Sequence, residues 1–323
     1  MRFLEDSRLY TDSHYCLARL REWRPRSDAP PLERIPVHFY WMGPFGAKQA
    51  LSIKSFLATH NPASSECWLW VDTAEAVEAA GTNPHLAPLL PLVRVKHFRL
   101  EEETRGTPFE GQDWLRGKLT PAAISDIIRY AVLHNHGGLY ADIDTLFLRD
   151  IDELRACVDD VDCAYQWSSI PRAASAYLRM RARGPIIVDL MQAACAARTA
   201  HPDALFSFER KHPGDFLILP SSSFSPLWLR VDGKDNATGP VPFNRFSGFF
   251  RRFGWFFRRD PKIRTSLDFF PGAYAYHWHN MWRVPEHADS YAGLLDAEFN
   301  DRLRSRYPDL APLARFGLTP SAR

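Results

Sequence analysis

In the first half of the chain, short apolar runs alternate with longer amphipathic segments. The runs are rich in β-branched and aromatic residues and predict buried strands at 35–41, 67–71, 92–96 and 139–148. The segments between them predict helices at 47–60, 73–80 and 122–135, the last of which starts after the capping pair Thr120-Pro121 and ends at Gly137-Gly138. This alternation predicts an α/β fold, with a mostly parallel central sheet and helices on both faces.

Beyond residue 150 the pattern is weaker. It predicts a helix over 172–200, strands near 162–167 and 216–219, and a serine-rich loop at 220–226. Nearer the start, 7–24 predicts a helix within a polar leader, and the charged, glycine-containing 101–118 predicts a mobile loop. The chain has no internal repeat, low-complexity tract or clear linker. We therefore expect an N-terminal extension over 1–34 and a single domain over 35–323.

Composition narrows the class of protein. The 323 residues are 46% hydrophobic and 24% charged, so a large globular core can form. A net charge of +2 is too balanced for a surface that tracks nucleic acid, and we expect no nucleic-acid partner. The five cysteines include no C-x-x-C pair, which argues against a zinc site and favours a reducing compartment. Without a signal-peptide pattern or a run of about 18 apolar residues, the expected location is cytoplasmic.

The block from Ser125 to Asp144 carries the candidate chemistry. Asp126 and Arg129 are spaced i, i+3 and share one face of the predicted helix. Asp142 and Asp144 lie two residues apart on the predicted strand, so we expect their side chains on the same side. An Asp-x-Asp triplet alone is common in surface turns, but two carboxylates within an apolar strand need a compensating cation. Oxygen ligands at a strand end suit Mg²⁺ or Mn²⁺, which indicates a metal–diphosphate site.

This block resembles the sugar-binding Asp-x-Asp region of retaining glycosyltransferases of the GT-A fold. Those proteins carry Ser-Asp-x-x-Arg followed by Gly-Gly-x-Tyr-x-Asp-x-Asp, with the spacing found here over 125–144. Their opening strand, Ile-Pro-x-x-x-His-x-x-Trp-x-Gly, is similar to the more compact Ile-Pro-Val-His-Phe-Tyr-Trp-Met-Gly at 35–43. The resemblance is to the yeast initiating mannosyltransferase and bacterial capsule-type transferases, and more distantly to the clostridial glucosylating toxins. It covers 35–150 well and 215–282 loosely.

The resemblance implies donor-binding roles for four residues. Trp41 would stack on the nucleotide base, although a core tryptophan at a strand end is the alternative. Asp126 and Arg129 would hold hydroxyls of the donor sugar, with Arg129 near the phosphates; the alternative is a solvated ion pair on a helix. Tyr140 would lie beside the donor phosphates, or else be a packed strand residue.

The resemblance also implies a metal centre. Asp142 would bind the ribose and a metal-bound water, and Asp144 would ligate Mn²⁺ or Mg²⁺ directly. The cation and Arg129 would stabilise the departing nucleoside diphosphate, so these three residues are the candidate catalytic set. The 35–150 half would then hold the donor and metal, and 151–323 would hold the acceptor and a donor-covering segment.

That covering segment is expected near the C-terminal end, at 275–282 (AYHWHNMW). It resembles the late His/Trp segment of these transferases, which folds over the donor. His277 is the candidate for a further metal or phosphate contact, with His279 as its rival. Asn280 and Trp282 would contact the donor. Relatives often have a serine before the last Trp, where this chain has Met281 after Asn280, so the contact at that point stays open.

The segment 246–259 (FSGFFRRFGWFFRR) is basic and aromatic. At about 100° per residue its phenylalanines fall on one side of a helix and its arginines on the other. Such a helix is typical of elements that bind an anionic membrane surface, and equally of a helix packed on a core. Gly248 and Gly254 weaken the helix by about 1 kcal/mol each.

Together these features predict a metal-dependent transferase that moves a hexose from UDP-hexose or GDP-mannose to a glycan or lipid-linked acceptor. The resemblance implies retention of configuration and a role in surface polysaccharide synthesis, with the enzyme cytoplasmic and peripheral at the inner membrane face. One alternative is an effector that glycosylates a host protein. Another is a non-catalytic scaffold that binds a sugar nucleotide. A metal phosphohydrolase is disfavoured because a two-metal site would need further His and Asp ligands.

Overall fold

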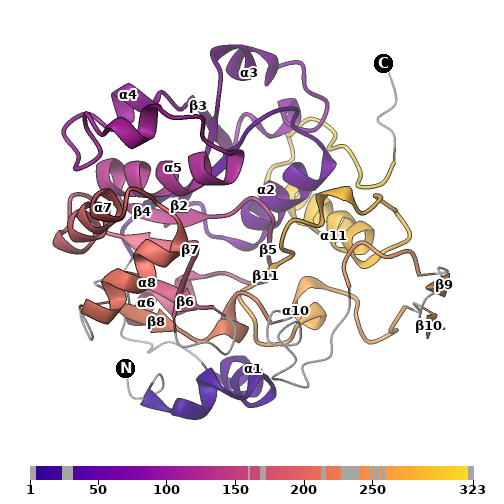
Figure 1. Ribbon diagram of the computed structural model, residues 1–323. Coiled ribbons are helices and arrows are strands. Elements are labelled where there is room, and N and C mark those ends of the chain that lie inside the picture. The colour runs from indigo at the N-terminus through magenta and orange to yellow at the C-terminus, as the bar shows by residue number, and fades with distance from the viewer. Residues whose placement is uncertain are drawn as a thin grey trace.

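A mixed sheet of seven strands forms the centre of the protein (Figure 1). The structure is a computed structural model that describes residues 5–23, 32–158, 161–167, 172–211, 216–226, 241–246, 249–250, 255–256 and 259–318. The strand order is β3 (Val93–His97), β2 (Ser65–Val71), β1 (Ile35–Trp41), β4 (Gly138–Ala141), β7 (Ala173–Met180), β6 (Cys163–Gln166) and β8 (Leu217–Leu219). The first four are mutually parallel, β7 is antiparallel to both its neighbours, and β6 and β8 are parallel. The predicted α/β class and mostly parallel sheet are confirmed.

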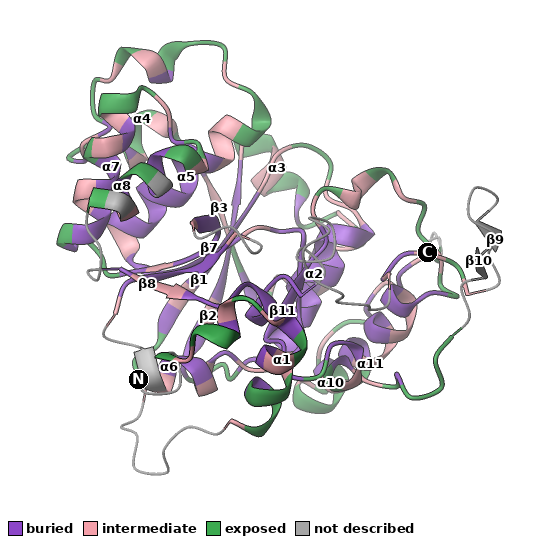
Figure 2. Cartoon of the chain, turned by 60° about the horizontal axis from the view of Figure 1, so that its bottom comes forward, coloured by how far each residue is buried: buried purple, intermediate pink, exposed green. Residues whose placement is uncertain are grey.

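Helices cover both faces of this sheet (Figure 2). The core on one face includes side chains of α1 (Ser13–Glu22), α2 (Ala47–Thr59) and α11 (Tyr291–Arg306), with α11 packed against α2. The core on the other face includes side chains of α5 (Pro121–His136), α7 (Pro185–Ala197) and α8 (Pro202–Lys211). The period-two alternation of a strand explains the division, because on β2 the side chains of Cys67 and Leu69 join the first core and those of Trp68 and Trp70 the second.

Short elements connect these layers. The short α-helices are α3 (Ala74–Ala79), α4 (Leu100–Glu103), α6 (Asp152–Val158) and α10 (Ser266–Phe269). The 3₁₀ helices are η2 (Ser7–Tyr10), η3 (Ala87–Leu89), η4 (Asp113–Arg116), η5 (Ser221–Ser223) and η6 (Met281–Arg283). Two antiparallel pairs stand apart from the main sheet, β5 (Thr145–Phe147) with β11 (Ala275–His277) and β9 (Phe249–Phe250) with β10 (Trp255–Phe256).

Part of one predicted helix and part of one predicted loop are wrong. Within 172–200, the first part forms β7, and only Pro185–Ala197 is helical. The alanine-rich sequence of β7 has helical propensity, but it pairs with β4 and β6 on its two sides, and that tertiary pairing overrides local preference. Part of the segment predicted as a loop at 101–118 instead forms the end of α4 and η4.

The basic aromatic segment 246–259 is not the predicted amphipathic helix where the structure describes it. Residues 249–250 and 255–256 form the antiparallel pair β9–β10, with Phe250 opposite Trp255. Aromatic residues favour strands and two glycines disfavour a helix, so the local sequence is consistent with this outcome. Residues 247–248, 251–254 and 257–258 lie outside the described residues.

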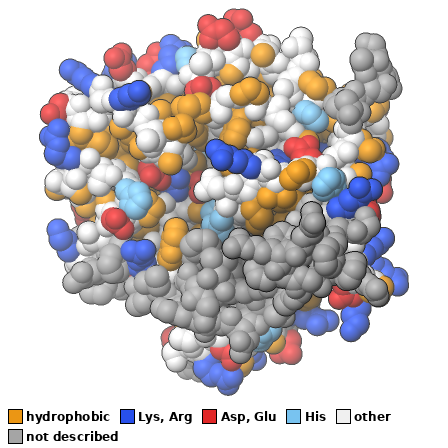
Figure 3. All heavy atoms as spheres, turned by 45° about the vertical axis from the view of Figure 1, so that its right-hand side comes forward, with side chains coloured by type: hydrophobic (Ala, Val, Ile, Leu, Met, Phe, Trp, Pro, Cys, Tyr) orange, Lys and Arg blue, Asp and Glu red, His pale blue; other side chains and the backbone are white. Residues whose placement is uncertain are grey.

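The surface is mixed in character on the face drawn in Figure 3. Hydrophobic side chains gather in the upper half of that face, and basic side chains are spread around its edge among acidic ones. None of the helices in the described ranges has both the length and the apolar character that crossing a membrane requires.

Candidate active site

All nine residues predicted to bind donor or metal line one cavity of about 540 Å³. They are Trp41, Asp126, Arg129, Tyr140, Asp142, Asp144, His277, Asn280 and Trp282. The cavity lies at the carboxyl ends of β1 and β4, because these parallel strands end at the same edge of the sheet. This is the edge where ligands bind in open α/β sheets.

The Asp-x-Asp pair lies in a turn rather than within a strand. The predicted strand 139–148 is divided into β4 and β5, and Asp142, Ile143 and Asp144 connect them. The division has a clear cause: β4 pairs with β1 and β7 in the main sheet, whereas β5 leaves it to pair with β11. The expectation that strand alternation aligns the two carboxylates is therefore wrong, and the turn brings them together instead.

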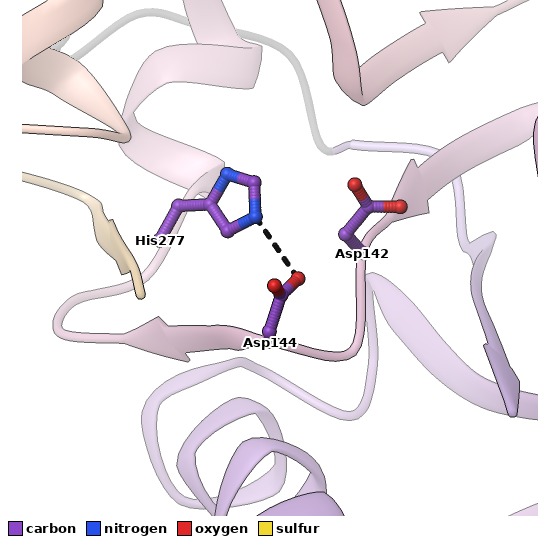
Figure 4. A group of neighbouring side chains, drawn as sticks. All are labelled: Asp142, Asp144 and His277. Atoms are coloured by element: carbon purple, nitrogen blue, oxygen red, sulfur yellow. Dashed lines mark hydrogen bonds and ion pairs between the residues drawn. The ribbon is translucent and has the colours of Figure 1, made fainter. Parts of the chain in front are cut away.

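The two carboxylates and the His277 imidazole form one cluster (Figure 4). One ligand atom from each of Asp142, Asp144 and His277 lies within 4.8 Å of the other two. The Nε2 of His277 donates to Oδ1 of Asp144 at 2.9 Å, and the carboxylate of Asp142 faces the same space from the end of β4. This places His277 rather than its rival His279 at the cluster, since Nε2 of His279 instead pairs with Oγ of Ser225 at 2.9 Å.

Backbone groups of the late segment complete the surroundings of Asp144. The amide of Asn280 donates to Oδ2 of Asp144 at 2.8 Å, and the amide of Trp278 donates to the Asp144 carbonyl oxygen at 2.9 Å. His279 and Asn280 have φ angles of 45° and 58°, in the left-handed region that non-glycine residues seldom adopt. The backbone thus accepts local strain where it meets Asp144.

Arg129 is the buried cation of the site. It is 5% exposed, and its Nη2 lies 3.0 Å from Oδ1 of Asp126 and 3.2 Å from Oδ1 of Asp142. Its Nη1 donates to Oγ of Ser175 at 2.7 Å, and its guanidinium lies 4.9 Å from the centroid of the Tyr140 ring. The spacing on α5 therefore gives a buried ion pair, not the solvated pair that was the alternative.

The two carboxylates of the turn have opposite electrostatic environments. Burial raises the pKa of Asp142 above its ordinary value, and the nearby Asp144 charge adds to this, although Arg129 opposes it. Burial also acts on Asp144, but the charge and hydrogen bond of His277 outweigh it and lower the pKa of that carboxyl. Against its own burial, Asp144 raises the pKa of His277. The cluster thus carries competing charges that a cation would relieve.

Two tryptophans form the wall of the cavity at the end of β1. The rings of Trp41 and Trp282 have centroids 4.8 Å apart, and Nε1 of Trp41 donates to the carbonyl oxygen of Pro44 at 2.9 Å. Both side chains are partly exposed and line the cavity. Trp41 therefore faces the cavity and is not a fully enclosed core residue.

The structure adds residues that the sequence pattern missed. Ser175 holds Arg129, and Oη of Tyr165 lies 3.3 Å from Nδ1 of His277. Trp167 and His201 line the cavity from the second half of the chain. Ser175 lay in a segment predicted as helix, and the other three carry no motif. The pairing of β7 and β6 with the main sheet brings Ser175, Tyr165 and Trp167 to the site, and His201 reaches it from the connection between α7 and α8.

The donor atoms present suit a divalent cation. Two carboxylates and one imidazole give a mixed oxygen and nitrogen set, which Mn²⁺ accepts, while Mg²⁺ prefers oxygen alone. The negative charge of the two carboxylates exceeds what Arg129 offsets, since Arg129 also pairs with Asp126. Asp142, Asp144 and His277 are the residues that would hold such an ion.

Comparison with known proteins supports the class that this geometry defines. Residues 48–159 match the family described as "Glycosyltransferase sugar-binding region containing DXD motif". The matched region includes α5, the glycine break and the Asp142–Asp144 turn. No curated protein matches the chain. This part of the chain thus carries a glycosyltransferase sugar-binding region with the DXD motif, as its resemblance to that class predicts.

Solved structures resemble the chain more distantly. The PaToxG glycosyltransferase is 18% identical, with a TM-score of 0.45, over 62% of this chain and 76% of that one. The galactosyltransferase LgtC, solved with donor and acceptor sugar analogues, is 13% identical over 84% and 96%, with a TM-score of 0.37. GlyE of Streptococcus pneumoniae TIGR4 is 12% identical over 58% and 46%, with a TM-score of 0.32. TM-scores this low support no conclusion about function. The assignment to the glycosyltransferase class therefore rests on the family match and on the residues of the site.

Proposed function

We propose that this glycosyltransferase is metal-dependent and moves a hexose from a nucleotide-sugar donor to a glycan or glycolipid acceptor. One observation carries the proposal: Asp142, Asp144 and His277 converge beside the buried Arg129 in a single cavity. A bound divalent cation, Mn²⁺ or Mg²⁺, would supply positive charge to the leaving nucleoside diphosphate. Asp142, Asp144 and His277 would hold it, with Asp142 also near the ribose.

The chain's own groups would bind and orient the donor. The Trp41–Trp282 pair would stack on the base, an interaction worth about 1–3 kcal/mol. Asp126 would accept hydrogen bonds from sugar hydroxyls at the start of α5. Arg129 stays cationic at any working pH, so its guanidinium would remain available to the sugar and the phosphates, beside Tyr140. Asn280 would close the donor side, next to Asp144.

The second half of the chain would bind the acceptor. Trp167 and His201 line the same cavity from residues 151–323, and a tryptophan face suits a sugar ring. We propose retention of configuration, on the resemblance to retaining enzymes, with the acceptor attacking on the face from which the diphosphate leaves. We also propose a surface-polysaccharide acceptor and a cytoplasmic setting. The helix on which membrane contact rested is absent from the described residues of 246–259, so lipid attachment of the acceptor is left to experiment.

The first experiment is a thermal-shift screen of the purified protein against UDP- and GDP-sugars, with and without Mn²⁺. A ligand at a hundred times its Kd stabilises the folded state by about 2.7 kcal/mol, which gives a clear shift. A shift that needs both Mn²⁺ and one of the two nucleotides supports the proposal and identifies the base. A folded sample that responds to none of them contradicts it.

Turnover separates the remaining alternatives. Binding of donor without any release of nucleoside diphosphate would identify a non-catalytic scaffold. With a labelled donor and a cell extract, a product that organic solvent extracts or that is polysaccharide supports the proposed acceptor class. A labelled product that protease destroys would instead identify a protein acceptor, as expected of an effector.

A further inference from the structure

We propose that Lys48 is a positioning residue that holds the stretch Met281–Val284, called the clamped stretch below, against the donor side of the cavity. Lys48 is the second residue of α2 and is 3% exposed. Its Nζ donates to three carbonyl oxygens of the clamped stretch, those of Met281, Trp282 and Val284, at 2.6, 2.9 and 2.6 Å. An ammonium group has three N–H donors, so this one short segment uses all of them.

The setting of the ammonium makes this contact hard to replace. Within the described ranges Lys48 forms no ion pair, and burial lowers the pKa of its amine. Its Nζ lies 4.7 Å from the centroid of Phe243, whose ring packs edge-on against Trp278 at 5.3 Å. If the clamped stretch moved away, the buried Lys48 ammonium would lose its three acceptors, which is costly in a low-dielectric interior. Lys48 therefore favours the closed arrangement, in which the clamped stretch lies against the cavity.

The clamped stretch includes Trp282, which connects the Lys48 contacts to the donor side of the cavity. The ring of Trp282 lies 4.8 Å from that of Trp41 and 5.7 Å from that of Trp278. Its carbonyl oxygen is one of the three that Lys48 holds. Lys48 does not line the cavity among the residues described there, so it acts through Trp282 rather than on the donor itself. This inference rests on the proposed function only for the identity of the ligand as a nucleotide.

The Lys48 clamp, meaning its three hydrogen bonds to residues 281–284, can be tested without any ligand. Lys48→Met keeps the length of the side chain and removes the charge and all three donors. Hydrogen exchange of peptides that span residues 280–285 is expected to become about ten-fold faster, since opening no longer strands a charge. The matched control is Ser55→Ala, on the same helix, where a buried hydroxyl bonds the Ser52 carbonyl and the Phe147 amide. The control should weaken α2 without speeding exchange at 280–285. If Lys48→Met does not fold, Lys48→Gln, with two N–H donors, carries the same test.

The effect on the donor is measured on the same proteins. With Mn²⁺ present, the Kd for UDP or GDP should rise about ten-fold in Lys48→Met, because apparent affinity falls with the closed fraction, and KM for the donor should rise more than kcat falls. In Ser55→Ala both should stay near the wild-type values. Unchanged exchange at 280–285 overturns the clamp, even where the wild type binds nucleotide normally. If Lys48→Met exchanges faster at 280–285 but keeps the wild-type Kd and KM, the role of Lys48 in donor binding is overturned. A wild type that binds no nucleotide overturns the proposed function, and the donor role with it, while the exchange data still decide the clamp.

Discussion

The Nε2 of His277 donates to Oδ1 of Asp144 at 2.9 Å, although the two residues are 133 positions apart in the chain. The antiparallel pairing of β5 with β11 creates this contact, with His277 opposite Thr145, the residue after Asp144. The family region ends at residue 159, so one side of the cluster comes from outside it. The site is therefore assembled from both halves of the chain, and each half can be tested separately.

Arg129 should matter for stability as well as for activity. Arg129→Met leaves Asp126 and Asp142 buried without their cation, which we expect to lower the free energy of unfolding by about 3 kcal/mol and to abolish transfer. Urea unfolding measures the first effect. Arg304→Met is the control, because Arg304 pairs with Asp301 on the surface, with side chains 53% and 76% exposed, and should change stability by less than about 0.5 kcal/mol. Equal losses in the two variants would contradict this account.

Metal affinity should fall on mild acidification. Burial raises the pKa of Asp142, and the Asp144 carboxylate, against burial, raises that of His277. A metal needs the carboxylate deprotonated and the imidazole neutral, so protons compete with it at a higher pH than for ordinary groups. The Kd for Mn²⁺, followed by calorimetry, should therefore rise steadily as the pH is lowered from 7 toward 5. A Kd that stays constant across that window would count against these three ligands.

Buried histidines should make the fold sensitive to acid. Burial lowers the pKa of His60 to about 3, whereas an unfolded histidine titrates near pH 6.5. The unfolded state binds the proton first, so stability is lost as the pH falls from the unfolded value toward the folded one. His60→Phe keeps a ring against Phe56 and Phe147 and removes the titration. Between pH 6.5 and 4.5 the wild type should lose about 2 kcal/mol more than this variant in denaturant melts. Identical pH profiles would refute the role of His60.

Gly138 should be intolerant of any side chain. It has φ +88°, and a Cβ there would lie 2.2 Å from the carbonyl oxygen of Pro36 on β1, at the start of β4. Gly138→Ala should therefore cost more than about 3 kcal/mol, since backbone strain and a clash with backbone act together. Gly106 has φ +73° but open space around its Cβ position. Gly106→Ala should pay for strain alone, about 1–2 kcal/mol in thermal or urea unfolding. A Gly138→Ala protein as stable as Gly106→Ala would show that β1 and β4 separate easily.

Local sequence predicted the parts of the fold in which one segment decides its own structure. The strand ending at Trp41 and the helix carrying Asp126 and Arg129 have clear patterns and caps, and the structure has them. The strand Ala173–Met180 was missed because its sequence favours a helix and only its two neighbours in the sheet decide otherwise. The contact of Ser175 with Arg129 could not be predicted for the same reason, because Ser175 lies on this strand.

In the candidate site, too, local sequence predicted some features, and tertiary structure decides the others. Asp142 and Asp144 were found from their motif, yet the reason given for their alignment was wrong, because pairing with β11 turns the chain between them. The choice between His277 and His279 could not be made from sequence, since the two lie in one short segment and only the position of Asp144 separates them. Residues without a motif, such as Trp167, reach the cavity through tertiary structure alone.

The central claim is that the Asp142–Asp144–His277 cluster makes this chain a metal-dependent transferase that uses a nucleotide sugar. Its most direct test needs no acceptor: the slow hydrolysis of the donor identified by thermal shift, followed as release of nucleoside diphosphate. We predict release by the wild type with Mn²⁺, none after chelation, and at least about a hundred-fold less from a folded Asp144→Asn protein, which has lost a metal ligand. Release by Asp144→Asn at the wild-type rate with Mn²⁺, or release by the wild type that chelation leaves undiminished, would contradict the claim.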